Sequence, residues 1–167
     1  MQPHSLFLSG LLLLALPGMS YAAEKVSEAD KTFVAKVSQG GMYEVELGKL
    51  AETKGERQDI RDQGNTEAHD HTLVGDKLKA ICRSNGIDFP DKLNPEFQSR
   101  LDKMKAEPGP KFDAAYLEDM KKIHAGDGAA FAKEAMGGTN PQLKAFAAET
   151  FRIVRRHIGE LDAKVSE

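Results

Sequence analysis

Apolar residues recur along most of this chain at alternating steps of three and four positions, the spacing that places them on one face of an α-helix. The pattern predicts four long helices, over residues 30–53, 57–83, 111–136 and 141–164. No segment shows the strict alternation of apolar and polar residues that is typical of a half-buried strand. The hydrophobic pattern therefore predicts an all-α protein.

Residues at the ends of these segments support the predicted boundaries. Ser27 and Asp30 form the pattern of a capping box before the first helix, and Gly86 follows the second helix as a left-handed cap. Gly137-Gly138 ends the third helix, and Pro141 occupies the first position of the fourth. Each predicted helix thus has a start or stop signal of its own.

The connection between the second and third helices is long and rich in proline. Residues 86–110 contain four prolines, and one short helix is predicted to start at Pro95 behind an Asn94 cap. The other two connections are short. One long crossover is typical of ferritin-like four-helix bundles, in which the first and fourth helices are parallel. We therefore expect a ferritin-like four-helix bundle whose crossover carries the short helix.

The inward face of every predicted long helix carries one polar residue near its middle. These residues are Glu44, His71, His124 and His157. Glu67 lies one turn before His71 on the same face. Asp127 lies about one turn after His124. Because polar groups that point into a core need partners there, we expect the first four side chains to converge, with Glu67 and Asp127 nearby.

Imidazole and carboxylate ligands on facing helices suit a transition-metal site for iron, manganese or zinc. The usual di-iron ligand set of such bundles includes Glu-x-x-His motifs, and the chain has none of them. It carries instead Glu67-x-x-x-His71, His124-x-x-Asp127 and His157-x-x-Glu160. The alternative is a buried polar layer that fixes the register of the helices without binding an ion. The residues alone leave both interpretations open.

The first helix contains Gly40-Gly41 on its inward face, one turn before Glu44. Glycine in a helix interior is destabilising by about 1 kcal/mol relative to alanine, so this pair has to serve some purpose. Either the helix kinks or packs closely against a neighbour here, or the glycines leave room beside Glu44. Both interpretations are open at this stage.

The first 22 residues have the pattern of a secretory signal. Leu6–Leu16 is an apolar run, and Pro17-Gly18 then precedes small residues that allow cleavage after Ala22. The run is too short to span a bilayer, which needs about 20 apolar residues. We therefore expect a periplasmic or secreted protein whose mature part, residues 23–167, is a single soluble domain without a transmembrane segment.

The mature part carries mixed charges and a single cysteine. The net charge of −3 comes with acidic and basic residues interspersed along the chain, so no basic surface for nucleic acid is predicted. Cys82 as the lone cysteine rules out an internal disulfide, and its place beside Ile81 predicts a buried, inert thiol. Packing therefore has to hold the domain together.

Several short motifs, in their order and spacing, resemble the exported bacterial family catalogued as domain of unknown function 4142. They lie within residues 28–165 and are Asp30-x-x-Phe33, Gly40-Gly41-x-x-Glu44-Val45-x-Leu47-x-x-Leu50-Ala51, Asp70-His71, Phe112-Asp113-x-x-Tyr116, His124, and Pro141-x-Leu143-x-x-Phe146-Ala147 leading to His157. Gln63, Gly64 and Glu67 replace an apolar patch that this family usually has before the Asp-His pair. The resemblance implies a ferritin-like fold, export and an association with envelope stress, without an established activity.

Two functions are consistent with these observations. The first is an exported metal-binding protein of uncharacterised activity that serves in envelope or oxidative stress. Its expected ligands are Glu44, Glu67, His71, His124, Asp127 and His157. The second is a non-enzymatic envelope protein whose inward polar layer is structural and whose surface binds a protein partner. The sequence names neither a reaction nor an oligomeric state.

Overall fold

The computed structural model describes residues 26–165 and is all-helical in that range, with five helices and no strand. The helices are α1 (Glu28–Lys54), α2 (Gln58–Asn85), α3 (Pro95–Ala106), α4 (Gly109–Gly137) and α5 (Pro141–Val165). None of them is both long enough and apolar enough to cross a membrane. The predicted secretory signal, residues 1–22, lies outside the described residues. The prediction of an all-α protein is confirmed for the part of the chain that the structure describes.

The residues predicted to cap the helices lie at the helix ends. The Ser27 hydroxyl accepts a hydrogen bond from the Asp30 backbone N–H, and the Asp30 carboxylate accepts one from the Ser27 backbone N–H. The Asn94 side chain accepts one from the Phe97 backbone N–H at the start of α3. Gly86 follows α2 with a φ of 64°, the left-handed conformation that glycine adopts without strain. The predicted ends of the long helices differ from the observed ones by at most two residues.

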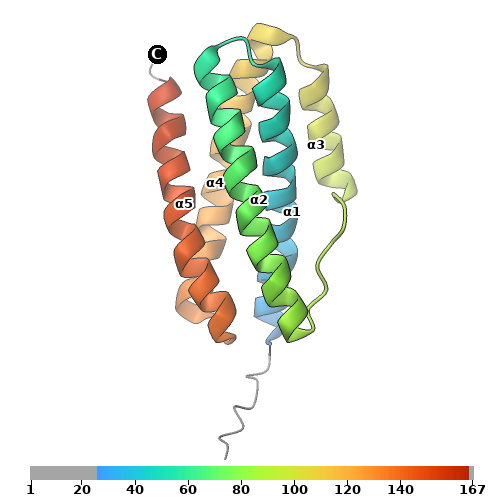
Figure 1. Cartoon of the computed structure of the whole chain (residues 1–167), viewed down its shortest axis with the longest axis vertical. Helices are drawn as coiled ribbons and strands as arrows, with labels where there is room; N and C mark the ends of the chain where they lie inside the picture. Colours follow the sequence, from blue (N-terminus) through green and yellow to red (C-terminus); the bar gives the residue numbers. More distant parts are fainter. Residues whose placement is uncertain (1–25, 166–167) are drawn as a thin grey trace, which may run out of the picture.

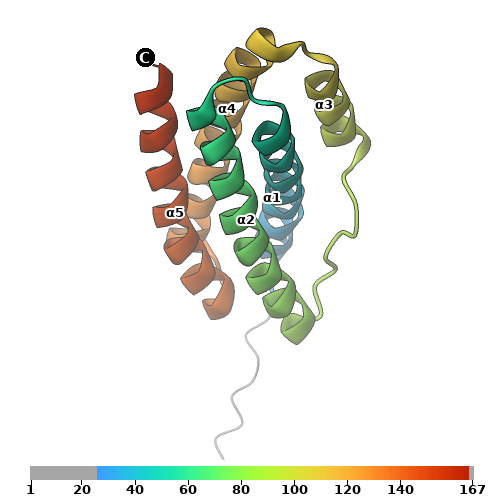
Figure 2. The same ribbon diagram turned by 45° about the horizontal axis from the view of Figure 1, so that its top comes forward.

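The four long helices lie side by side, and the short helix α3 stands outside them (Figure 1). Figure 1 shows α1 and α5 running in one direction and α2 and α4 in the other. Contacts between α1 and α2, α2 and α5, α5 and α4, and α4 and α1 close the four helices around a shared interior. The connection after α2 and helix α3 together return along the length of the molecule, as Figure 2 shows from another angle. The inward faces of four helices therefore meet along one axis.

Two hydrophobic clusters fill this interior, one on each side of its middle. The first includes Leu47, Ile60 and Leu161. The second includes Leu78 and Phe146. Burial of these apolar side chains is the dominant stabilising force of the fold. His71, His124 and His157 fall between the two clusters along α2, α4 and α5, and Glu44 lies at the edge of the first cluster beside Tyr43. These residues form a polar layer across an otherwise apolar core.

Two glycines allow the backbones of α1 and α2 to touch. A Cβ atom added to Gly48 would lie 2.7 Å from the carbonyl oxygen of Gly64, and one added to Gly64 would lie 2.6 Å from the carbonyl oxygen of Gly48. Real Cβ atoms do not approach backbone so closely, so both positions require glycine. The polar, glycine-containing first half of α2 is therefore a close-packed part of the helix.

The pair Gly40-Gly41 has two different surroundings. A Cβ atom at Gly40 would collide with the carboxylate of Asp127, so a neighbouring helix does pack closely here. A Cβ atom at Gly41 would meet nothing within 4 Å. The interpretation of a close helix contact therefore applies to Gly40, whereas Gly41 faces open space.

The one cysteine is buried in the second hydrophobic cluster, as predicted. Cys82 is 0% exposed and free. Burial raises the pKa of its thiol to about 11, which keeps the thiol protonated and unreactive at neutral pH.

Candidate metal centre

Four buried side chains from three helices meet between the two hydrophobic clusters. Helix α2 contributes Glu67 and His71, because residues four positions apart share a helix face. His124 comes from α4 and His157 from α5. His71 is 3% exposed and the other three are 0% exposed. One ligand atom from each of the four lies within 4.8 Å of those of the other three.

One carboxylate oxygen, Glu67 Oε2, lies in contact distance of all three imidazoles. It is 3.2 Å from His71 Nε2, 3.2 Å from His124 Nε2 and 2.8 Å from His157 Nδ1. The nitrogens are also close to one another, because His124 Nε2 lies 3.4 Å from His71 Nε2 and 3.2 Å from His157 Nδ1. Three nitrogens and one oxygen thus face a common point.

Each imidazole has an oxygen acceptor at its other, outward nitrogen. His71 Nδ1 lies 3.1 Å from Glu44 Oε2, and His124 Nδ1 lies 2.8 Å from a main-chain carbonyl oxygen one turn earlier in α4. His157 Nε2 lies 3.0 Å from Asp70 Oδ2 and also 3.0 Å from Nη2 of Arg156, the ion-pair partner of Asp70. A neutral imidazole carries one N–H, and an acceptor at the outward nitrogen holds the N–H there. When such a ring is neutral, its inward nitrogen presents a lone pair.

The inward carboxylate oxygen lacks a hydrogen bond. Glu67 Oε2 is buried without a hydrogen-bond partner, although three nitrogens lie within ion-pair distance of it. A neutral ring whose N–H points outward donates nothing to this oxygen, whereas a protonated ring carries a second, inward N–H that reaches it. Lone pairs and a carboxylate oxygen that face one another at these distances repel unless a proton or a cation lies between them. A buried His/Glu cluster with this donor set can hold a metal ion.

The second oxygen of Glu67 is held by Gln63, one turn earlier in α2. The Gln63 amide donates to Glu67 Oε1 at 2.9 Å and also to Glu160 Oε2 at 3.3 Å. Gln63 is only 4% exposed, so its side-chain amide has little access to water and is held by these two contacts. It fixes the carboxylate with its other oxygen directed at the histidines. The helical spacing does not reveal this role, and the only signal for it in the sequence is a glutamine one turn before Glu67 on the same helix face.

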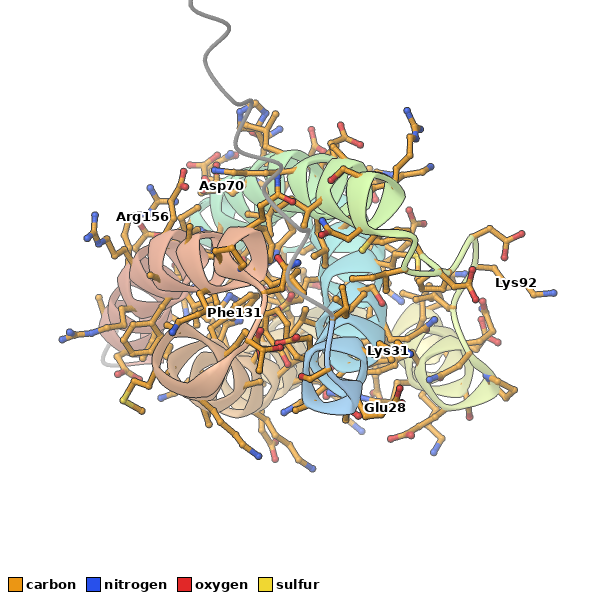
Figure 3. All side chains as sticks on the ribbon, turned by 90° about the horizontal axis from the view of Figure 1, so that it is seen from below. Glu28, Lys31, Asp70, Lys92, Phe131 and Arg156 are labelled. Atoms are coloured by element: carbon orange, nitrogen blue, oxygen red, sulfur yellow. The ribbon has the colours of Figure 1, made fainter. Side chains whose placement is uncertain are left out.

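Asp70, the acceptor beside His157, is held in place by a residue at the surface. Asp70 forms an ion pair with Arg156, which lies 51% exposed on α5. Figure 3 shows the labelled Asp70 and Arg156 next to each other at the margin of the molecule. Asp70 thus reaches a ring of the cluster from outside the inward helix face. The pair closes the polar layer where α2 meets α5.

Opposing electrostatic effects set the protonation of the cluster. Burial lowers the pKa of His124, but the charges of Glu44 and Glu67 outweigh it and raise that pKa to about 9. Burial also lowers the pKa of His157, and Glu67 and Asp70 raise it by more. Burial raises the pKa of Glu67, yet the three histidines hold it well below its ordinary value. Negative charge thus dominates the site and favours a bound cation, either protons or a metal ion.

Two of the residues predicted as ligands lie outside this group of four. Glu44 faces the outward Nδ1 atoms of His71 and, at 3.4 Å, His124, so it stands behind the rings. Asp127 is 4% exposed and packs against Gly40. Burial and the charge of Glu44 raise the pKa of Asp127 to about 7. Both residues lie on the same inward helix faces as the cluster. Helical spacing shows which polar groups face inward, but it does not show which of them meet at one point.

Comparison with known proteins identifies the family of the chain and a protein of similar fold. It is similar to the crystal structure of a DUF305 fragment from Deinococcus radiodurans, with a TM-score of 0.75 and 13% sequence identity over 85% of this chain and 98% of that one. At this identity the likeness shows the fold alone. No curated protein matches the chain. The model of the family described as domain of unknown function (DUF4142) matches residues 15–163, which confirms the resemblance found in the sequence motifs: the chain belongs to this family.

Proposed function

We propose that this protein binds one divalent transition-metal ion between Glu67, His71, His124 and His157. The observation that carries the proposal is the spacing of the inward atoms, five of whose separations lie between 2.8 and 3.4 Å. Four tetrahedral ligands at about 2.0–2.1 Å from a zinc ion lie about 3.3–3.4 Å apart. The four side chains therefore stand close to the positions that a bound ion requires.

The outward contacts of the rings support the same proposal. Histidine ligands almost always donate their second N–H to a carboxylate or a backbone carbonyl, which fixes the tautomer and the ring orientation. Glu44, the Met120 carbonyl and Asp70 stand at these positions. In this proposal Glu44 orients ligands and is not a ligand itself. Once deprotonated, three rings with acceptors at their outward nitrogens can present three lone pairs to one ion.

The donor set favours zinc over iron or manganese. Three imidazoles and one carboxylate suit zinc in tetrahedral geometry, whereas manganese favours additional oxygen ligands in a larger coordination shell. Catalytic zinc sites keep one position open for water, while this site offers four protein ligands. We therefore assign it to holding an ion, in storage, buffering or stabilisation of the fold, and not to catalysis.

The proposal extends to the architecture and the compartment. The parallel α1 and α5 and the returning connection before α3 support a ferritin-like four-helix bundle. The apolar run at residues 6–16 supports export, with the mature chain starting at Ala23. Intact-mass analysis of an envelope extract tests this start. A full-length chain confined to the cytoplasm contradicts export.

A metal titration tests the proposed site. Purified protein is stripped with a chelator and titrated with zinc(II), iron(II) and manganese(II) in turn, with bound metal measured by elemental analysis. We expect one zinc ion per chain and weaker uptake of the other two metals. His71→Ala is expected to lose this binding, because it removes one of the four ligands. His69→Ala is the matched control, since His69 lies two positions away on the exposed face of the same helix.

The control decides between a site and adventitious binding. If wild type, His71→Ala and His69→Ala take up equal zinc, the cluster is a structural polar layer. If manganese binds more tightly than zinc, the assignment of a tetrahedral zinc-type site is wrong.

A further inference from the structure

A groove of about 540 Å³ lies beside the metal centre, where α1 and α2 face the crossover and α3. Its wall includes Val45 of α1, Val74 of α2, Phe89 of the crossover and Leu101 of α3. His71 also lines the groove, and the other three residues of the cluster do not. The groove therefore meets the centre at a single ligand.

The remaining sides of the centre are covered. The other three ligands are 0% exposed, and the two hydrophobic clusters fill the interior beyond the polar layer on either side. On the α5 side, the guanidinium of Arg156 contacts both Asp70 and His157. His71, at 3% exposure, has the thinnest cover.

Two glycines keep the approach to His71 open. Gly41 and Gly75 both line the groove, and a Cβ atom added to either would meet nothing within 4 Å. Gly75 lies one turn after His71 in α2. Helical side chains lean toward the N-terminus of their helix, so a side chain at position 75 would lie over His71. Glycine weakens a helix interior, yet here no close packing requires it, in contrast to Gly48 and Gly64.

The charges around the groove nearly cancel. Its lining carries Glu46, Asp76 and Asp91 together with Lys49, Lys79, Lys92 and Lys105. Figure 3 shows Lys92 at the outer margin of the molecule, and Lys49 is paired with Glu46 at 2.9 Å. A lining of mixed sign provides no strong steering field. An incoming ion is therefore not drawn in by charge. The groove instead gives it open space beside His71.

We propose that this groove is the route by which the metal ion enters and leaves the centre. His71 is the gate: its ring turns aside into the groove, the ion passes, and the ring closes as the fourth ligand. This inference rests on the proposed function and adds to it the path along which the ion is exchanged. Gly75 then serves as the position that leaves the gate free to move.

Exchange kinetics with a plugged groove test the route. Stripped purified protein is mixed with zinc(II), and the loaded protein with an excess of a chromophoric zinc chelator, in wild type and Gly75→Leu. We expect Gly75→Leu to slow loading and release alike by about tenfold or more, which corresponds to about 1.4 kcal/mol in the barrier, with an unchanged dissociation constant. Gly159→Leu is the control, because Gly159 is an exposed helical glycine of α5 with nothing within 4 Å of an added Cβ.

The outcomes separate the route from the site. Wild type that binds no zinc overturns the proposed function itself. If wild type binds zinc but Gly75→Leu exchanges it at the wild-type rate, or at the rate of Gly159→Leu, the route is wrong. A Gly75→Leu variant that changes affinity without slowing both directions also overturns it, because a plug raises a barrier and leaves the end states alone. Faster exchange in Arg156→Gln with unchanged exchange in Gly75→Leu would place the route on the α5 side instead.

Discussion

At the scale of single residues, the acceptors behind the three rings decide which nitrogens can bind an ion. Without an acceptor, an imidazole is free to carry its proton on either nitrogen, and an inward N–H would block the site. Glu44 and Asp70 are carboxylates, which hold an N–H more firmly than a neutral carbonyl does. Gln63 acts similarly on Glu67, since it occupies one oxygen and leaves the other directed inward.

Asp70→Asn tests the contribution of an outward acceptor. The amide keeps the size of the side chain but loses the charge that orients and polarises His157. We expect zinc affinity to fall by about 10–100-fold, the usual effect of removing such a partner. Isothermal titration of the stripped protein measures it, with Asp62→Asn as the control, because Asp62 is an exposed carboxylate of the same helix. Equal affinity in the two variants would show that Asp70 serves only the ion pair with Arg156.

The inward orientation of the cluster was predictable residue by residue, but the division of roles was not. Helical spacing alone placed His71, His124 and His157 inside, and the structure buries all three. Glu44 and Glu67 also share that spacing, yet one stands behind the rings and the other among the inward atoms. This difference depends on how the helices are displaced along one another, which the periodicity of one helix does not contain.

At the scale of elements, glycines in α2 serve two opposite purposes. Gly64 lies where the backbones of α1 and α2 touch, whereas Gly75 lies against open space. The sequence predicted the helix ends well, because caps and prolines are local signals. It gave no indication that the polar start of α2 packs tightly, because the contact pairs Gly64 with Gly48 on another helix. Such pairing is a property of the tertiary arrangement.

Alanine at these two glycines should change stability in opposite directions. At Gly64 the new Cβ would lie 2.7 Å from the Glu52 backbone nitrogen, and backbone cannot yield easily. We expect Gly64→Ala to lose about 1–3 kcal/mol from overpacking, against a helix-propensity gain of about 1 kcal/mol, so that it is destabilised on balance. Gly75→Ala should gain up to about 1 kcal/mol, since it gains propensity without a clash. Denaturant unfolding of the stripped protein measures both, and a stabilised Gly64→Ala would contradict the close approach.

At the scale of the whole molecule, the polar layer couples metal binding to the stability of the fold. Residues from three helices form the proposed site, and Glu44 adds the fourth helix behind it. An ion held there connects α2, α4 and α5 in the folded state only, because the unfolded chain does not keep these residues together. At about 100 times the dissociation constant, such an ion adds about 2.7 kcal/mol to the free energy of unfolding.

The stability of the protein should depend on pH in opposite ways with and without zinc. The pKa of His124 rises from 6.5 to about 9 on folding. Its protonation therefore stabilises the metal-free protein fully below about pH 6.5, and this contribution is lost as the pH rises through about 9. Zinc must displace that proton, so its affinity increases over the same range.

We therefore expect the Tm of the stripped protein to fall from pH 6.5 to 8.5, while the increase in Tm on adding zinc becomes larger. Thermal unfolding at three pH values, with and without buffered zinc(II), measures both slopes. His124→Gln should lose the zinc-dependent increase at every pH and flatten the slope of the metal-free protein, because it removes both the proton site and a ligand. An increase in Tm that is largest at pH 6.5 would be incompatible with an ion that competes with protons for the inward nitrogens, and the cluster would then be a proton-holding layer.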